Sequence, residues 1–344
     1  MIFLKKIFFI LLVPVFLLFT TSATLKNSKS SYIVMEKSSK RILEGENIDE
    51  QLLIASTAKV LTAITVIENY NLEEEITITA NDVNEVGSRV YLKENEKMKR
   101  IDLLYALMLR SANDAASALS SNNSKDFIYK MNETAKKIGM KNSVFENASG
   151  LDEREYNLST AYDMALLTIY ASNNDIFKDI ASAHNHSCRS NFRGYTWLNK
   201  HKLVNNDDSF ILGKTGFTKK AGRILVSNYY VDSKDIIIVT INHSDDWNFH
   251  KKCSEKINEY EFKSVFKEGL YEIELDKTYY IACYNDIVIP IKNDEYEKIK
   301  IKFIIYDNNT ILKVYLVDEL LCEYNLKIYD EAKLDLNLLI EALN

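Results

Sequence analysis

A serine and a lysine three residues apart offer the first candidate chemistry. In Ser56-Thr-Ala-Lys59 a hydroxyl and an amine would project from one face of a helix, because side chains at i and i+3 are neighbours there. A neutral amine beside a hydroxyl is a general base beside a nucleophile. This role requires the lysine pKa to fall from ~10.4 towards ~7, which burial, a helix N-terminus or a second cation favours. The pair predicts nucleophilic serine catalysis.

Two further polar motifs strengthen that prediction, because a four-residue S-x-x-K pattern also arises by chance. Residues 111–113 read Ser-Ala-Asn and fall between two predicted helices, in a loop that can reach a cleft or simply cap the next helix. Residues 214–216 read Lys-Thr-Gly within a predicted strand. Glycine there indicates either a bulge or close approach of a ligand. A lysine, a hydroxyl and a bare strand edge suit an extended peptide that ends in a carboxylate.

The elements that must position these motifs follow from the hydrophobic pattern. Apolar residues at helical spacing predict a buried helix that begins at Ser56, and the middle of the chain is also helical. Strands occur on both sides of this helical part, which predicts an α/β fold with one antiparallel sheet and a cluster of helices. The predicted strands are 32–35, 41–43, 210–217, 223–231 and 236–242, and the predicted helices are 56–70, 101–110, 114–120 and 126–139.

The last part of the chain has a different pattern. Short segments rich in Ile, Tyr and Val predict a small all-β domain, with a boundary near residues 263–269. Leucines at partly helical spacing predict a packed terminal helix over residues 330–344. The predicted strands of this domain are 279–283, 287–291, 298–306, 311–317 and 323–329.

Composition and the N-terminus bound the location and the partners. The 344 residues carry a net charge of −6, which gives no electrostatic footprint for nucleic acid. Lys5 and Lys6 precede an apolar run over residues 7–19, and small residues follow at 21–23. Because this run contains Pro14 and is short for a membrane span of ~20 residues, a cleaved signal over residues 1–23 is favoured over a permanent anchor. We expect an exported envelope or secreted protein, attached to the membrane only if the signal is retained.

The cysteines and histidines add little chemistry. The four cysteines are scattered without a C-x-x-C pair, so a zinc ribbon or thioredoxin-type site has no support. Cys283 and Cys322 could form a disulfide or remain buried free thiols. His184 and His186 could be two metal ligands, but the neighbouring sequence does not complete a set. We interpret that segment as a polar loop and predict neither a metal nor a cofactor.

The order S-x-x-K, S-x-N and K-T-G is typical of penicillin-binding proteins and class A β-lactamases. Two longer segments indicate one family among these proteins: Asn147-Ala-Ser-Gly-Leu-Asp152 and Lys214-Thr-Gly-Phe-Thr-Lys-Lys-Ala-Gly222. From about residue 31 to 262 the chain resembles the D-alanyl-D-alanine carboxypeptidases, the low-molecular-weight penicillin-binding proteins. The resemblance implies a β-lactamase/transpeptidase-like antiparallel sheet with a helical cluster over residues 24–262. It also implies a small β-rich domain over residues 270–344.

The resemblance implies a catalytic cycle as well. Ser56 would attack the carbonyl between the last two D-alanines of a peptidoglycan stem peptide, with Lys59 as general base. Ser111 would relay a proton to the leaving amine, and water would hydrolyse the acyl-enzyme. Penicillins and other β-lactams, which resemble this peptide end, would acylate the same serine.

The other motif residues are implied to bind substrate. Asn113 would hold the substrate amide. Lys214 would lower the pKa of the catalytic lysine and attract the terminal carboxylate, which Thr215 would bind. Gly216 belongs to the same motif, and the backbone N–H groups of the serine nucleophile and Phe217 would form the oxyanion hole.

Some features depart from the commoner family pattern, and rival functions remain. Ala112 stands where many members have glycine, and His250 or Lys251 is left as the candidate for a further carboxylate-binding cation. A serine β-lactamase would need a deacylating base, for which Glu153, four residues before Asn157, is the candidate. A catalytically silent protein that binds cell wall or β-lactams is the alternative from another class.

Overall fold

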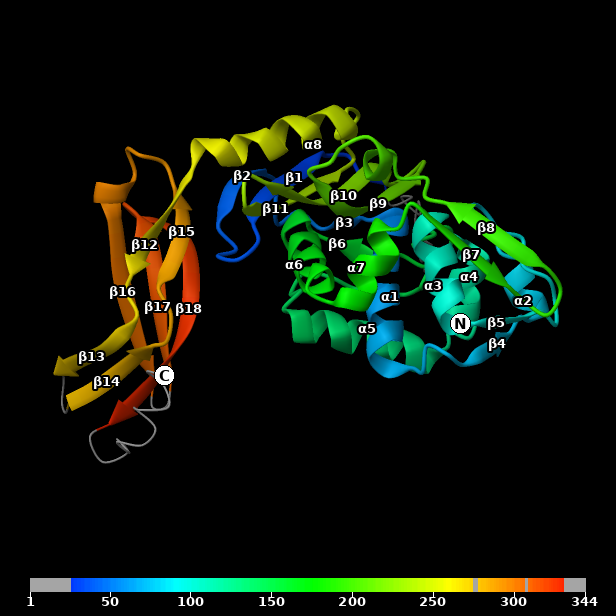
Figure 1. Ribbon diagram of the computed structural model, residues 1–344, viewed down its shortest axis with the longest axis horizontal. Coiled ribbons are helices and arrows are strands. Elements are labelled where there is room, and N and C mark those ends of the chain that lie inside the picture. The colour runs from blue at the N-terminus through cyan, green and yellow to red at the C-terminus, as the bar shows by residue number, and fades with distance from the viewer. Residues whose placement is uncertain (1–25, 275–277, 307–308, 331–344) are drawn as a thin grey trace, which may run out of the picture.

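The computed structural model describes residues 26–274, 278–306 and 309–330 (Figure 1). The predicted signal over 1–23 and nearly all of the predicted terminal helix over 330–344 lie outside the described residues. Figure 1 shows a larger part with sheet and helices, joined through α8 (Asp246–Glu255) to a part made of strands.

The larger part is built on one antiparallel sheet, as predicted. Its strand order is β2-β1-β11-β10-β9, so strands from both ends of this part lie side by side. Both faces are covered: α8 contacts β10 and β11, and α6 contacts β1, β10 and β11. Residues such as Ile237 and Ile238 therefore enter different hydrophobic clusters although they are adjacent, because successive strand side chains point to opposite faces. The strands are β1 (Ser31–Glu36), β2 (Ile42–Glu46), β9 (Phe210–Thr218), β10 (Gly222–Val231) and β11 (Lys234–Ile241).

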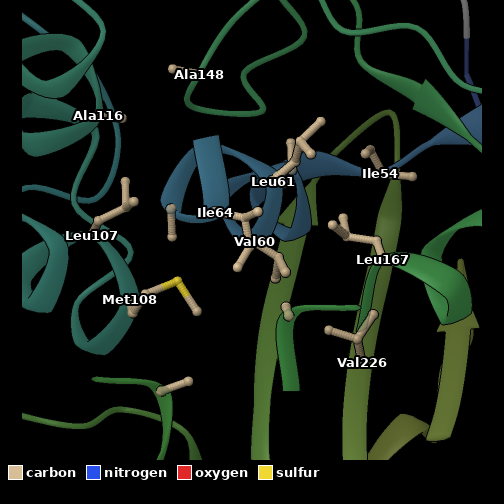
Figure 2. Close-up of a cluster of buried hydrophobic side chains, with 14 of the residues drawn as sticks. Ile54, Val60, Leu61, Ile64, Leu107, Met108, Ala116, Ala148, Leu167 and Val226 are labelled. Carbon is tan, nitrogen blue, oxygen red and sulfur yellow. The ribbon is translucent and has the colours of Figure 1, made fainter. Parts of the chain in front are cut away.

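The helices gather around one buried helix. Every residue from Lys59 to Val66 in α1 is buried, and Figure 2 shows Ile64 of α1 in a hydrophobic cluster with Leu107 and Met108. The predicted helix at Ser56 begins as a 3₁₀ turn, η1 (Ala55–Ala58), before α1 (Lys59–Asn69). The other helices of this part are α2 (Ala80–Val83), α3 (Arg100–Leu109), α4 (Asn113–Leu119), α5 (Lys125–Ile138), α6 (Ala161–Ser172) and α7 (Asp175–Ser182).

Small strand pairs complete the larger part. The prediction of a polar loop around His184 and His186 is wrong, because β7 (Asn185–Arg189) pairs with β8 (Gly194–Leu198) as a hairpin. Exposed residues alternate with partly buried ones in β7, and most of its residues are polar. By composition alone such a segment resembles a loop. The remaining pairs are β3 (Leu52–Leu53) with β6 (Leu158–Ser159) and β4 (Glu75–Thr77) with β5 (Lys97–Lys99), and the short 3₁₀ turns are η2 (Lys202–Asn205) and η3 (Lys256–Glu259).

The C-terminal part is made of strands around its own core. The five predicted strands are present, and two more precede them: β12 pairs with β15, and β13 joins the sheet β13-β14-β18-β17-β16. Arg41, in the β1–β2 connection, donates to the carbonyl of Pro290 and pairs with Glu295 at 2.9 Å, which links the two parts. Cys283 and Cys322 both lie in this core as free thiols. The elements are β12 (Glu261–Phe266), β13 (Gly269–Glu274), β14 (Thr278–Cys283), β15 (Ile287–Ile291), η4 (Tyr296–Lys298), β16 (Ile299–Tyr306), β17 (Asn309–Leu316) and β18 (Glu319–Asp330).

Candidate active site

The Ser56 hydroxyl and the Lys59 amine meet at the start of the buried helix. Lys59 Nζ lies 3.0 Å from Ser56 Oγ. The 3₁₀ turn η1 leads directly into α1, so the serine stands one turn before the lysine. Lys59 has no exposed surface, whereas Ser56 is only half-buried. A hydroxyl that a ligand can reach is therefore held against an amine that solvent cannot reach.

Asn113 and Ser149 complete the surroundings of that amine. Lys59 Nζ donates to Asn113 Oδ1 at 2.8 Å and to the Ser149 carbonyl. The amide nitrogen of Asn113 donates to the Val86 carbonyl at 2.6 Å, which fixes the orientation of its side chain. These partners are neutral, so they orient the amine without stabilising its charge as a carboxylate would.

A second buried lysine lies on the neighbouring strand. Lys214 of β9 is 2% exposed, and its Nζ donates to Ser111 Oγ at 2.9 Å and to the Thr215 carbonyl at 2.8 Å. Ser111 is itself buried and has a φ of 56°, in the left-handed region that non-glycine residues seldom occupy. This backbone conformation turns the chain between α3 and α4 so that Ser111 meets the β9 lysine.

Burial sets the electrostatics of both lysines. Desolvation, and after it the charge of the nearby cation Lys200, lowers the pKa of Lys59 to about 7. Desolvation, followed by the charges of Lys59 and Lys200, holds the pKa of Lys214 well below its ordinary value. Burial and a second cation thus both lower the pKa of Lys59, but the cation is Lys200, which the sequence did not single out, and not Lys214, to which the resemblance gave that role. At neutral pH a sizeable fraction of Lys59 is the free amine that a general base needs.

Glycines bring the strand and the loop against the serine. A Cβ on Gly216 would lie 3.1 Å from the Ile54 carbonyl and 3.3 Å from the Ser56 nitrogen. A Cβ on Gly150, whose φ is +80°, would lie 1.9 Å from the Ala55 carbonyl oxygen. Gly150 therefore requires glycine, whereas a side chain at Gly216 would press on the 3₁₀ turn η1, which would have to shift by a few tenths of an ångström.

A pocket opens over these groups. Ser56, Ser111, Thr215, Gly216 and Phe217 all contribute to its lining, and Phe217 is 66% exposed. The structure thus brings together the predicted residues of all three motifs, with Lys59, Asn113 and Lys214 buried behind the surface. The pocket is also lined by residues that the sequence did not indicate: Ser88, Lys200, Lys202, Arg223, Ile224, Asp246 and Trp247.

Neither His250 nor Lys251, the two candidates for a carboxylate-binding cation, lines the pocket. His250 has no exposed surface and sits between Ser227 Oγ at 2.7 Å and Thr240 Oγ1 at 3.0 Å, and Lys251 is exposed on α8 outside the lining. Neither position supplies a cation to this pocket. Arg223 does, because β10 pairs it directly with Phe217, and its Nε donates to Asp246 Oδ1 at 3.2 Å. No local motif marked this arginine, since only the strand register places it there.

The candidate base of a β-lactamase lies elsewhere. Glu153 is exposed and is not part of the pocket lining. Asn157 is buried, and its side-chain oxygen accepts from the backbone nitrogens of Glu146 and Asn147 at 2.8 and 3.1 Å. The E-x-x-x-N resemblance therefore corresponds to a surface acid and a structural amide.

The fold and the three motifs define a serine peptidase of the penicillin-binding type. A family model described as D-alanyl-D-alanine carboxypeptidase, Peptidase S11, matches residues 19–245. The match covers more than half of the chain, so this protein belongs to that family of serine peptidases.

Individual relatives agree with this assignment. The D-alanyl-D-alanine carboxypeptidase DacF of Bacillus subtilis is 26% identical over 60% of this chain, which spans just over half of that relative, 55%. A D-alanyl-D-alanine endopeptidase of Haemophilus influenzae is 29% identical over 72% of this chain and 89% of its own length. The crystal structure of the carboxypeptidase DacD from Francisella tularensis shares the fold, with a TM-score of 0.69 over 90% of this chain and 94% of that chain at 20% identity.

Helices that could cross a bilayer are not found among the described residues.

Proposed function

We propose that this protein removes the terminal D-alanine from peptidoglycan stem peptides through an acyl-enzyme on Ser56. The observation that carries the proposal is the contact between Ser56 Oγ and the buried Lys59 amine at 3.0 Å. The lowered pKa of Lys59, about 7, makes this amine a competent base near neutral pH. The D-alanyl-D-alanine relatives supply the substrate class.

In the acylation step Lys59 takes the hydroxyl proton and Ser56 Oγ attacks the carbonyl of the penultimate D-alanine. The backbone N–H groups of Ser56 and Phe217 would stabilise the resulting oxyanion, a contribution of ~3–4 kcal/mol per donor in comparable sites. Ser111 passes its proton to the leaving amine and is reprotonated from Lys214, whose Nζ is 2.9 Å away. The C–N bond breaks and D-alanine leaves. Water then attacks the ester and gives its proton to Lys214, while Lys59 returns its proton to Ser56 Oγ, so the serine and both lysines regain their starting states.

The substrate is held by the groups around this centre. Asn113, whose orientation is fixed by the Val86 carbonyl, binds the substrate amide. The edge strand β9, whose Thr215, Gly216 and Phe217 line the pocket, receives the extended peptide as an added strand. The terminal carboxylate lies near Thr215 and the cations of the pocket, and a β-lactam carboxylate occupies the same place while its ring carbonyl acylates Ser56.

The test is D-alanine release from a Lys-D-Ala-D-Ala peptide by the purified chain from residue 24, beside Ser56→Ala. We expect release by the first protein only, together with a penicillin adduct on the first protein only. Release by folded Ser56→Ala at the wild-type rate would refute the assignment of the nucleophile. A stable penicillin adduct without any D-alanine release would instead support a silent binding protein, and rapid penicillin hydrolysis would support a β-lactamase.

Endopeptidase action on cross-links is the second candidate, because the Haemophilus influenzae relative carries that name. The same serine would attack the corresponding D-alanyl carbonyl, and the leaving amine would belong to a second, cross-linked stem peptide in place of free D-alanine. A cross-linked muropeptide dimer, offered beside the linear peptide, separates the two. Faster turnover of the dimer would favour the endopeptidase.

We also propose that the protein works outside the cytoplasmic membrane, in the cell envelope. The support is the signal-like pattern of residues 1–23 and the location of the family's substrate class. We further propose that a boundary near residues 263–269 separates the catalytic domain from the small β-rich domain. Expression with and without residues 1–23, followed by cell fractionation, tests the export.

A further inference from the structure

A cluster of three different ligand types lies outside the pocket. Asp102 stands in the first turn of α3, and His186 and Cys188 lie on β7. A carboxylate oxygen, a ring nitrogen and the thiol sulfur of these residues all lie within 4.8 Å of one another. The two β7 residues are two positions apart, so both side chains project from the same face of the strand, towards α3.

Packing holds the histidine ring in place. The ring stacks on Tyr105 of the same helix α3, with centroids 3.7 Å apart and an angle of 2° between planes. Its Nε2 lies 2.7 Å from Asp102 Oδ1. His184, the other histidine of this segment, has its Nδ1 2.6 Å from Asn205 Oδ1 and lies outside the cluster. The fold therefore places His186, and not His184, beside a carboxylate and a thiol.

The chemistry of the three donors points to one class of ion. One oxygen, one nitrogen and one sulfur suit Zn²⁺ and similar borderline cations, whereas Mg²⁺ and Ca²⁺ take oxygen ligands. In a tetrahedral zinc site, bonds of ~2.0–2.3 Å place ligand atoms roughly 3.3–3.8 Å apart. The three donor atoms lie within 4.8 Å of one another, and the histidine–aspartate contact of 2.7 Å would have to widen to admit the ion.

We propose that Asp102, His186 and Cys188 bind a zinc-type divalent cation, with water in the fourth position. Binding releases the Cys188 thiol proton to solvent, leaves the proton of the neutral imidazole on Nδ1 of His186, and replaces the histidine–aspartate hydrogen bond by two bonds to the metal. The ligands are absent from the lining of the pocket, so the ion is structural and the acyl-transfer steps do not pass through it.

The ion would fasten the β7–β8 hairpin to the start of α3. The helix α3 leads to Ser111, and β8 leads to Lys200, whose backbone nitrogen donates to the Leu109 carbonyl at 3.1 Å. Both arms that emerge from the proposed site therefore end at the pocket. A cation that binds only the folded chain raises its stability by mass action.

The experiment is titration of the metal-free chain from residue 24 with Co²⁺, which reports a thiolate ligand by a near-ultraviolet charge-transfer band. We expect one equivalent to produce the band, Zn²⁺ to displace it, and Zn²⁺ to raise the melting temperature. Cys188→Ser should abolish the band, and His186→Ala should weaken Co²⁺ binding by at least ~10-fold. His184→Ala and Cys253→Ser are the matched controls and should bind as the wild type does.

Three results would overturn the proposal. One is a folded wild type that gives no thiolate band at millimolar Co²⁺. Another is a band that persists in Cys188→Ser, or that disappears in the Cys253→Ser control. The third is unchanged affinity in His186→Ala. If Cys188→Ser does not fold, the wild-type protein is treated with an alkylating reagent instead, and bound Zn²⁺ should protect Cys188 from it. Equal alkylation with and without Zn²⁺ would count against the site.

Discussion

The lysines of the pocket and those of the C-terminal β-rich part are treated in opposite ways by the fold. Lys59 and Lys214 are buried, and their described partners are hydroxyls, carbonyls and an amide. Lys267 and Lys292 are 72% and 40% exposed, and each pairs with a carboxylate, Asp286 and Glu259, at 2.9 and 3.0 Å. Burial lowers the pKa of the first pair, and the carboxylates raise the pKa of the second pair.

The difference shows what a catalytic lysine requires. A carboxylate partner stabilises the ammonium form and so removes the free amine from the pH range in which it could act as a base. Burial against neutral partners does the reverse, at a cost in stability that surface lysines avoid. In this molecule the lysines proposed to act in catalysis are thus the buried ones, whose pKa values are lowered.

The largest effect that would test this comparison is loss of the buried amine. Lys59→Met should lower the rate of Ser56 acylation by roughly 10²–10⁴-fold, the usual contribution of a positioned base. Lys59→Arg should fail to a similar degree, because it keeps a cation but cannot give up its proton near neutral pH. Acylation rates by penicillin and circular dichroism of each variant provide the check. High activity of folded Lys59→Arg would show that charge, not basicity, is needed.

The next effect is on the pH profile. Because the folded-state pKa of Lys59 is about 7, the free amine is lost as pH falls through 7, and kcat/KM should drop about tenfold per unit below it. The unfolded chain keeps this lysine protonated up to its ordinary value of 10.5. Its contribution to the free energy of unfolding therefore rises with pH between about 7 and 10.5. A flat acylation profile from pH 5 to 8 would contradict the lowered pKa.

A smaller effect should follow from a methyl group behind the serine. In Gly150→Ala the new Cβ meets the Ala55 carbonyl oxygen, and the residue must also hold a positive φ. We expect the free energy of unfolding to fall by at least ~2 kcal/mol and acylation to slow, because the 3₁₀ turn η1 must move. Gly139→Ala is the control, since its φ is also positive but nothing lies within 4 Å. If both variants lost activity equally, the loss in Gly150→Ala would come from the strained positive φ and not from displacement of η1 beside the pocket.

The smallest effect should come from a surface lysine. Lys267→Met removes an exposed ion pair of the β-rich part, and such pairs contribute little to stability because solvent and salt screen them. We expect the rate of D-alanine release and the thermal midpoint to stay within the error of the wild-type measurements. A clear loss of activity would show that this part of the chain takes a direct part in catalysis.

Much of the fold was predictable because its causes are local. The apolar strands β10 and β11, the buried helix α1 and the glycine that ends α5 with φ of 93° all follow from patterns within a few residues. β12 was not predicted, since Glu261–Phe266 contains three charged or polar residues beside its aromatics and gains its strand form by pairing with β15. Likewise, β7 is recognisable as a strand only through its partner β8.

The sequence by itself determined the serine–lysine pair, because one helical turn separates them, and it determined the order of the three motifs. Only the tertiary structure decided that Lys200 is the cation beside Lys59, that Arg223 lies across from Phe217, and that Asp102 meets the β7 ligands. The physical reason is separation along the chain. Contacts between residues that are distant in sequence depend on strand register and helix packing, which are set by the whole core and leave no mark in any short segment.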